Sequence, residues 1–325
     1  MKKGFYISYF LFLVIILGIP LVLKDPYFLG ILVQVGFFSL IAMGLSLLMG
    51  YAGQISLGHA AFFAIGAYTS AILTGTYGWS GWLAIPAGMV LAAIVAFIVG
   101  TPALKLKGHY LAMATLGFGE IVHIFISAEV ELTGGPSGYL HALIPYLKIG
   151  EFQLDNEFKY YYFTWAIVLV ILLLTLHLIN SRIGRALKSI HSDPEAARSL
   201  GINVARYKVQ IFVLSAVFAS IAGSLYCHFI LFVAPGPFGL MESVLLVTMV
   251  IIGGVGSIWG AIAGAALLTI LPEVLRTFND YNILVYGGIL LFIMLFVPGG
   301  IFGGLQSLWK GLLKKIQSRR VVKDG

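Results

Sequence analysis

Long uncharged apolar segments constrain the fold of this sequence more than any other feature. Segment 27–49 contains no Asp, Glu, Lys or Arg, and neither does segment 161–180. A helix that crosses a bilayer needs roughly 20 such residues. Further apolar segments follow one another along the chain, at 5–23, 60–75, 83–103, 109–128, 209–232, 241–275 and 281–297. The sequence therefore predicts an all-α, polytopic helical membrane protein.

The composition excludes a soluble globular protein. Hydrophobic residues make up 60% of the 325 residues and charged residues only 10%, whereas a soluble domain is about 45–50% apolar and about 25% charged. Much of the surface must therefore face the lipid bilayer. The net charge of +7 does not indicate a nucleic-acid partner, because the basic residues fall in short loops and the tail. The single cysteine, Cys227, excludes an internal disulfide and a cysteine zinc cluster.

The distribution of charge predicts the orientation and the number of spans. If the N-terminal lysines are cytoplasmic, the basic loop 181–208 also lies inside and the acidic segment 129–160 lies outside. The basic tail 304–325 then lies inside only if 241–275 forms two short spans that meet near 253–257. We therefore expect one transmembrane domain over 1–325, with about ten spans including short or broken helices, and with both termini cytoplasmic.

The first apolar segment, 5–23, has a second interpretation as a signal peptide, because it follows the basic sequence MKK. No A-x-A-type cleavage site follows it, and Lys24-Asp25-Pro26 come directly after it. Many further apolar segments follow. We therefore expect a retained first membrane helix.

The second apolar segment continues into a glycine-rich, polar stretch, GYAGQISLGHA, at 50–60. Close helix packing explains its glycines. It does not explain Gln54, Ser56 and His59, because polar groups at membrane depth need partners or a wet cavity. These three residues are candidates for the substrate pathway or its gate. A similar break, GGVGSIWGAIAG at 253–264, occupies a comparable place in the second half, as in transporters with internal repeats.

Glu120 is a fourth candidate for the pathway or gate, because few ionisable residues fall within the apparent spans. A glutamate satisfied by a neighbouring helix is the structural alternative. The sequence lacks a Gly-x-Ser-x-Gly motif, paired carboxylates in a plausible cleft, and histidines at metal-ligand spacing. No Lys-Ser or Lys-Thr follows the glycines of the breaks at 50–60 and 253–264, so neither break is a phosphate loop. We expect no catalytic residue, no metal site and no cofactor bound by this chain.

The basic loop 181–208, SRIGRALKSIHSDPEAARSLGINVARYK, is the most specific feature of the sequence. Ser192-Asp193-Pro194-Glu195 has the spacing of a capping box, and Pro194 suits the first turn of a helix. A solvated, positive-inside loop is the structural alternative, but it does not require such helix signals. The pattern predicts a short helix that lies across the membrane surface.

This predicted helix has a stop and a continuation. Gly201 is a natural helix stop, and Asn203 can cap the helix that continues into the seventh span. Ala196 and Ala197 are expected on one face of the short helix. We interpret Asp193 to Gly201 as a coupling segment that docks into a groove of another protein.

At this loop the sequence resembles the membrane subunits of bacterial ABC importers, whose signature is EAA, three residues and then Gly. Glu195-Ala196-Ala197 and Gly201 have this spacing, although Val213-Leu214 stand where the family has Leu-Pro. Several motifs, from GLSLLMGYAGQISLGHAAFFAIGAYTSAIL through KGHYLAMATLGFGEIV and LTGGPSG to PGGIFG, narrow the resemblance to the branched-chain amino acid permeases of the LivM type. The matching blocks extend from about Gly44 to Gly303.

This resemblance implies an ABC importer permease fold in the bacterial cytoplasmic (inner) membrane. It also implies a second related permease subunit, two cytoplasmic ATP-binding subunits and a periplasmic or lipid-anchored amino acid-binding protein. The ATPases would use ATP and Mg, and their closure would move the coupling loop so that the transmembrane helices alternate access. The residues expected to dock the ATPases are Asp193, Pro194, Glu195, Ala196, Ala197 and Gly201.

Two alternative functions stay open from the sequence. The first is a permease subunit of an ABC importer for urea or a short amide, since urea importers have similar membrane subunits. The second is a stand-alone channel or secondary transporter, which predicts transport by the purified chain without ATP or partners. That alternative leaves the surface helix unexplained.

Overall fold

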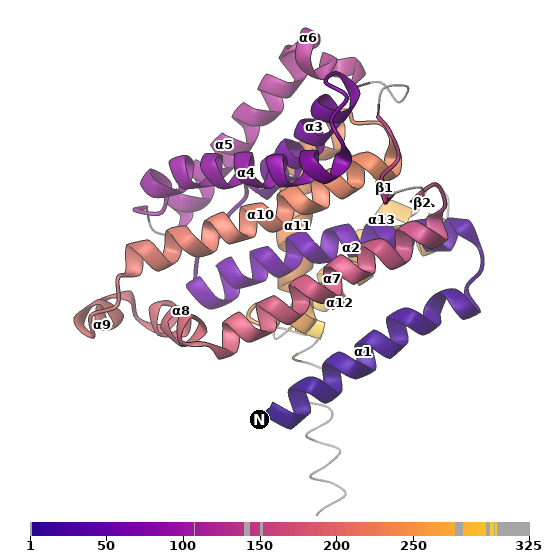
Figure 1. Cartoon of the computed structure of the whole chain (residues 1–325). Coiled ribbons are helices and arrows are strands. Elements are labelled where there is room, and N and C mark those ends of the chain that lie inside the picture. The colour runs from indigo at the N-terminus through magenta and orange to yellow at the C-terminus, as the bar shows by residue number, and fades with distance from the viewer. Residues whose placement is uncertain are drawn as a thin grey trace, which may run out of the picture.

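The computed structural model describes residues 2–106, 108–139, 144–149, 152–276, 282–296, 300–301 and 303. Ten helices in this part of the chain have 14 residues or more (Figure 1), and they confirm the predicted all-α, polytopic architecture. They are α1 (Lys2–Val22), α2 (Pro26–Ser46), α3 (His59–Gly75), α4 (Gly81–Ala103), α5 (His109–Ala128), α7 (Glu157–Asn180), α10 (Val204–Ile230), α11 (Leu240–Gly253), α12 (Ile258–Leu275) and α13 (Asn282–Phe296). The predicted basic tail at 304–325 lies outside the described residues.

Six helical segments among the described residues are long and apolar enough to cross a membrane on their own. One is the continuous segment Pro26–Tyr51, formed by α2 and the π-helical turn η1 (Leu47–Tyr51). The others are α4, α5, α7, α10 and α12. Shorter apolar helices, Ile7–Val22 within α1 and α11, accompany them. The apolar segment 241–275 is divided between α11 and α12, as the charge distribution predicted.

Short elements connect the long helices. They are α6 (Val130–Thr133), η2 (Gly135–Ser137), α8 (Arg182–Ser192), α9 (Pro194–Ser199), η4 (Gly236–Phe238) and an antiparallel pair of two-residue strands, β1 (Lys148–Ile149) and β2 (Phe152–Gln153). In Figure 1, α8 and α9 project from the left of the bundle and the strand pair from the right. We call these the α9 end and the hairpin end. The basic loop and the described parts of the acidic segment thus lie at opposite ends of the bundle.

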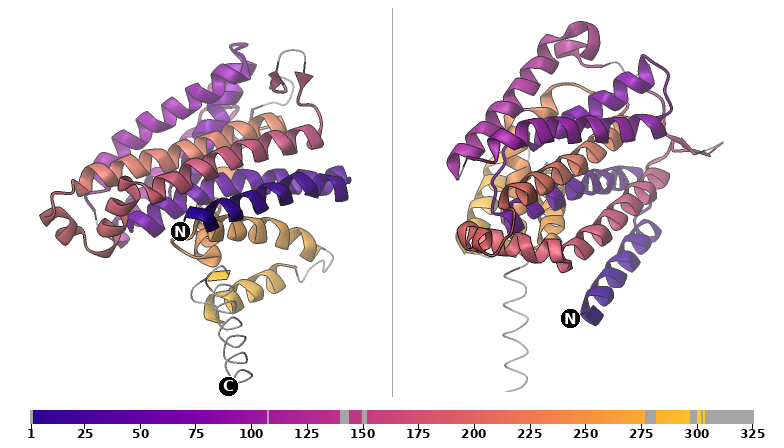
Figure 2. Two further views of the ribbon diagram at one scale, coloured as in Figure 1. Left: turned by 60° about the horizontal axis from the view of Figure 1, so that its bottom comes forward. Right: turned by 60° about the vertical axis from the view of Figure 1, so that its left-hand side comes forward.

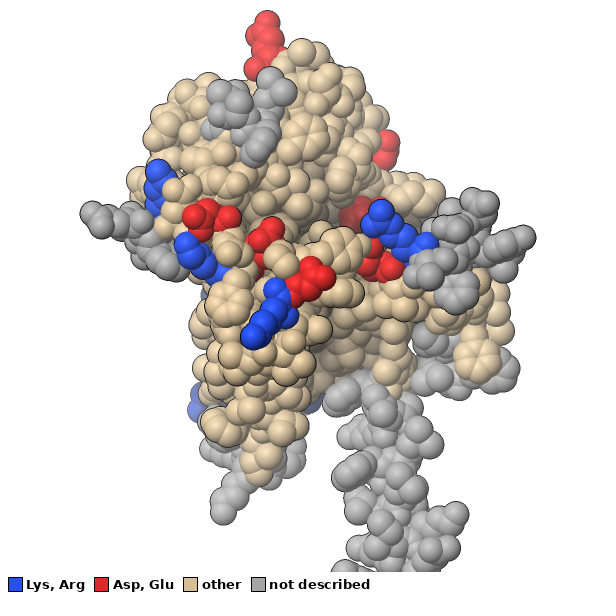
Figure 3. Space-filling model, turned by 90° about the vertical axis from the view of Figure 1, so that its right-hand side faces the viewer, with Lys and Arg blue, Asp and Glu red and all other residues tan. Residues whose placement is uncertain are grey.

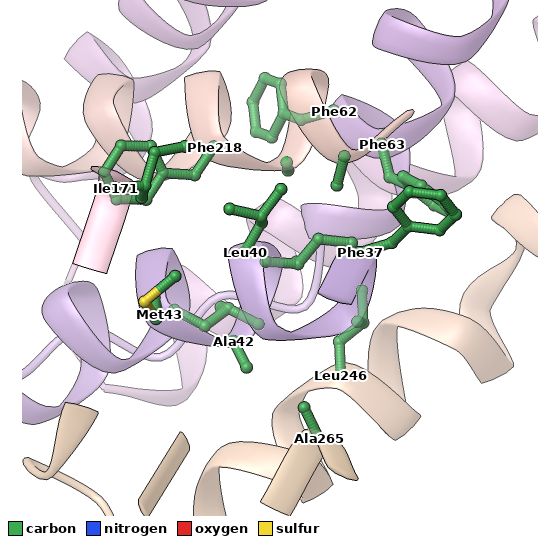
Figure 4. Packing of buried hydrophobic residues seen from close by; sticks show 14 of the residues in the cluster. Phe37, Leu40, Ala42, Met43, Phe62, Phe63, Ile171, Phe218, Leu246 and Ala265 are labelled. Atoms are coloured by element: carbon green, nitrogen blue, oxygen red, sulfur yellow. The ribbon is translucent and has the colours of Figure 1, made fainter. Parts of the chain in front are cut away.

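Helices α2 and α10 form the middle of the bundle. Figure 2 shows α4 and α5 on one side of them and α12 and α13 on the other. Helix α2 is apolar on every face, which is typical of a helix that is buried all round, and Val33, Leu40 and Ile41 are fully buried. Figure 4 shows side chains of α2 packing against residues of α3, α7, α10, α11 and α12.

The hairpin end carries the connecting residues 76–80, 129–139, 144–149, 152–156 and 231–239. The backbone N–H of Tyr139 donates to the carbonyl of Val233 over 2.7 Å, and the hydroxyls of Thr76 and Tyr139 share a hydrogen bond of 2.5 Å. Figure 3 looks onto this end, where acidic and basic side chains gather on an otherwise uncharged surface.

Small residues let α3 and α10 approach closely. A Cβ atom added to Gly223 would lie 1.9 Å from the carbonyl oxygen of Phe63, and one added to Gly66 would lie 2.1 Å from that of Ser220. The backbones are therefore in direct contact, as is common where membrane helices associate through small residues. This contact fixes the first turn of α3, where His59 lies, against α10.

Candidate functional site

The predicted coupling segment folds as α9, an exposed helix between two defined caps. The carboxylate of Asp193 accepts hydrogen bonds from the backbone N–H groups of Glu195 (2.9 Å) and Ala196 (3.1 Å). Pro194 occupies the first helical position, where its missing N–H costs nothing. Asn203 caps α10 by accepting from the N–H of Arg206 over 3.1 Å. The predicted short helix and its connection to the seventh span are therefore present.

The predicted capping box at 192–195 is wrong in detail. Ser192 ends the preceding helix α8, and its hydroxyl donates to the carbonyl of Lys188 over 3.1 Å. Glu195 pairs instead with Arg198, at 2.8 Å. The reason is that the carboxylate of Asp193, one residue later, reaches two free N–H groups of α9 and takes the N-cap position.

The C-terminus of α9 forms a Schellman motif around Gly201. The N–H of Ile202 donates to the carbonyl of Ala197 (3.1 Å), and that of Gly201 to the carbonyl of Arg198 (3.0 Å). Gly201 has φ +81°, the left-handed conformation that this motif needs and that glycine adopts without strain. The stop predicted at Gly201 is confirmed.

Ala196 and Ala197 do not share a face of α9, contrary to expectation. Ala196 is exposed, whereas Ala197 is fully buried and packs with Ile190 and Val204 in a small cluster beneath α9. Adjacent residues on a helix point about 100° apart, which follows from 3.6 residues per turn. Ala197 thus holds α9 on α8 and α10, and Ala196 belongs to the outward face with Glu195.

Helix α8 connects α9 to the two glycine-rich breaks. A Cβ atom on Gly53 would lie 2.8 Å from Nδ1 of His191 in α8, and one on Gly50 would lie 2.3 Å from the backbone nitrogen of Gly256. Lys188 also lies over the ring of Tyr51, at 5.6 Å. The break after α2 and the break between α11 and α12 are therefore in contact with each other at the α9 end, next to α8.

The polar residues after the first break form a buried network. His59 is 1% exposed, and its two ring nitrogens contact hydroxyl groups: Nδ1 that of Ser56 (3.1 Å) and Nε2 that of Ser215 in α10 (2.6 Å). The N–H of Leu57 donates to Thr115 Oγ1 in α5 over 3.0 Å. His59 thus joins α3 to α10, and the backbone of Leu57 joins the preceding segment to α5.

Gln54 has a different environment from Ser56 and His59. Its Oε1 is buried without a hydrogen-bond partner in the described part of the chain. It lines a cavity of about 1160 Å³ at the α9 end, between the connection from α4 to α5 and the start of α10. Leu104, Pro194 and Val209 also line this cavity. Of the four predicted pathway residues, Gln54 faces this cavity.

Glu120 lies on α5 and is half-buried. Its carboxylate has no hydrogen bond or ion pair with the described residues, and no hydrogen bond joins it to Ser56 or His59. The structure therefore does not bring all four predicted residues into one site. The described residues also contain no group of three His, Cys, Asp or Glu side chains that could hold a metal ion.

Sequence reasoning missed a polar group at the start of α11. Glu242, in the first turn of α11, has a buried Oε1 without a hydrogen-bond partner among the described residues. Tyr68 of α3 is 4% exposed, and its hydroxyl is likewise unpaired there. A signal was available, because Glu242 is the only charged residue between Lys208 and Glu273.

Comparisons with known proteins identify the family. Residues 27–297 match the family described as the branched-chain amino acid transport system / permease component. The chain is 36% identical, over 81% of its length and 67% of the relative's, to the high-affinity branched-chain amino acid transport system permease protein LivM of Escherichia coli (strain K12).

Two further relatives have the same kind of description. The permease protein LivH of Escherichia coli (strain K12) is 28% identical, over 82% of this chain and 91% of LivH. BraD of Pseudomonas aeruginosa is 29% identical over the same shares. No solved structure matches the chain. On the evidence of the family match and of these relatives, the chain belongs to the family of permease components of branched-chain amino acid transport systems.

Proposed function

We propose that the chain is the transmembrane permease subunit of an ATP-driven importer for branched-chain amino acids. The observation that carries the proposal is α9, an exposed helix capped at both ends and continuous with α10 through Asn203. A free surface loop has no need of two caps. The family match favours amino acids over urea as the substrate class.

The proposed complex contains a second related permease, two ATP-binding subunits in the cytoplasm and an amino acid-binding protein on the other side of the membrane. LivM and LivH are both described as permease proteins of branched-chain amino acid transport, and both resemble this chain. This supports a pair of related permeases. We assign ATP and Mg to the partner ATPases. The α9 end faces the cytoplasm of a bacterial inner membrane, because the basic loop lies there.

The contacts of α8 offer a route by which a movement of the ATPases is transmitted to the two glycine-rich breaks. A push on the exposed face of α9 displaces α8, because Ala197 packs with Ile190 of α8. Helix α8 in turn touches the first break through His191 and Gly53, and that break touches the second break. Rigid elements in such contact can transmit a displacement. We infer that both breaks move together during alternating access.

Glu195→Lys tests this proposal. Both Glu195 and its partner Arg198 are mostly exposed, at 65% and 60%, so the ion pair contributes little to the stability of the fold, at most about 1 kcal/mol. We expect the reconstituted complex with Glu195→Lys to lose leucine uptake and to retain fewer ATPase subunits on purification. Reversal of a charge at a docking face is strongly unfavourable for association.

The matched control is Glu131→Lys, which makes the same charge change on an exposed residue at the hairpin end. It should leave ATPase retention normal. Normal leucine uptake and normal ATPase retention by the complex with Glu195→Lys would refute the docking proposal. Uptake of urea but not leucine by the wild-type complex would refute the substrate class.

A further inference from the structure

Three buried polar atoms that have no hydrogen-bond partner among the described residues belong to side chains in or next to the segment that begins α11. They are the hydroxyl of Tyr68, Nδ1 of His123 and Oε1 of Glu242. The ring of Tyr68 lies 5.8 Å from that of Phe238, and Cε1 of His123 lies 3.6 Å from the position that a Cβ atom would take on Gly239. These two neighbours immediately precede α11, and Glu242 follows within its first turn.

Aromatic rings surround this place. The ring of Phe238 lies 5.1 Å from that of Phe63 and 6.2 Å from that of Tyr226, and the rings of Phe63 and Tyr226 are 5.4 Å apart. Glu242 thus follows, within one turn of α11, a ring that packs in a group of aromatic rings contributed by α3, η4 and α10.

Glu242 is half-buried, and its Oε1 is buried. An ionised carboxylate there is stabilised by a positive partner, because removing an isolated charge from water is unfavourable and the group otherwise takes up a proton. The described residues supply no ion pair to Glu242, and the sequence has no Lys or Arg between Lys208 and Arg276. A carboxylate together with the faces of aromatic rings is the combination that binds an ammonium group. A free ammonium group on the substrate satisfies this requirement.

We propose that the first turn of α11 binds the ammonium group of the transported amino acid, with Glu242 as its counter-ion and with Tyr68 and Tyr226 contacting it. This inference rests on the proposed function. The site lies at the end of α11 opposite the Gly254–Ser257 connection, and hence toward the hairpin end. An amino acid that enters from the hairpin end meets this site before it reaches the two glycine-rich breaks.

Saturation-transfer NMR on the assembled transporter, reconstituted without its binding protein, tests the site directly. The two probes are leucine and 4-methylpentanoate, which is leucine without its amino group. We expect the wild-type complex to bind leucine more tightly than 4-methylpentanoate. Glu242→Gln should weaken leucine binding by about tenfold or more, as expected for the loss of a hydrogen bond to a charged group, and should leave 4-methylpentanoate binding unchanged. Glu242→Asp should restore part of the preference.

Glu131→Gln is the matched control, because Glu131 is exposed at the hairpin end, and it should retain the wild-type preference. Equal weakening of both probes by Glu242→Gln would indicate a structural residue and overturn the site. Unchanged leucine binding by Glu242→Gln, or no preference in the wild type, would also overturn it. Wild-type leucine uptake is measured in parallel, and its absence would refute the proposed function rather than the ammonium site alone.

Discussion

Substitution of Gly50 by alanine tests whether the backbones of the two glycine-rich breaks are in direct contact and move together. A Cβ atom on Gly50 would lie 2.3 Å from the backbone nitrogen and 2.4 Å from Cα of Gly256. Nonbonded carbon atoms prefer separations of about 3.5–4.0 Å, so the two backbones must move apart by roughly 1 Å or more. Neither can avoid the methyl group by changing a rotamer, because both contacts are backbone atoms. Overpacking of this kind typically costs about 1–3 kcal/mol.

The assay for Gly50→Ala combines stability and coupling in the purified, reconstituted complex. We expect its apparent melting temperature to fall by at least about 2 °C. Leucine uptake per ATP hydrolysed should also decrease, because the two glycine-rich breaks can no longer make their backbone contact. Gly117→Ala on α5 is the control, since no atom of the described residues outside the adjacent backbone of its own helix lies within 4 Å of its added Cβ. Alanine favours a helix over glycine by about 1 kcal/mol, so this control should be neutral or stabilising. Equal behaviour of the two variants would refute the backbone contact between the breaks.

Two further substitutions probe the caps and the buried network. Asp193→Ala removes both N-cap hydrogen bonds of α9, at an expected cost of about 0.5–2 kcal/mol. Amide hydrogen exchange in α9 should therefore accelerate in this variant, whereas Asp193→Asn should remain near wild type. Unchanged exchange in Asp193→Ala would contradict the capping role. Ser215→Ala removes the 2.6 Å partner of His59 Nε2 and should destabilise the complex by about 1–3 kcal/mol. Thermal unfolding measures this loss, and a variant as stable as wild type would show that the network does not hold α3 to α10.

Local sequence signals predicted the elements whose formation depends on neighbouring residues. Three helix-end signals were predictable from the sequence: the cap at Asp193, the stop at Gly201 and the cap at Asn203. Each acts on N–H or C=O groups within a few positions along the chain. The long apolar segments were predictable because a membrane span requires a nearly continuous run of apolar residues. The capping box failed because two adjacent residues, Ser192 and Asp193, were both able to cap.

The candidate pathway residues were harder to assign. Gln54, Ser56 and His59 were singled out correctly as buried polar residues, but only the fold separates the network of His59 with Ser215 from the cavity that Gln54 lines. Glu242 is the only charged residue in a long uncharged stretch, but the sequence did not assign it a role. Its proposed role depends on Tyr68 and Tyr226, which come from other helices.

The sequence by itself determined that this chain is a helical membrane protein with a capped surface helix at 194–199, and it indicated the family. The reason is that hydrophobic length, capping and motif spacing are properties of contiguous residues. Only the tertiary structure decided that Gly50 meets Gly256, that Ala197 faces inward while Ala196 faces outward, and that the ring of Phe238, just before α11, packs with Tyr68 and Tyr226. Such contacts join helices that are distant in sequence, and close packing of the whole bundle selects them.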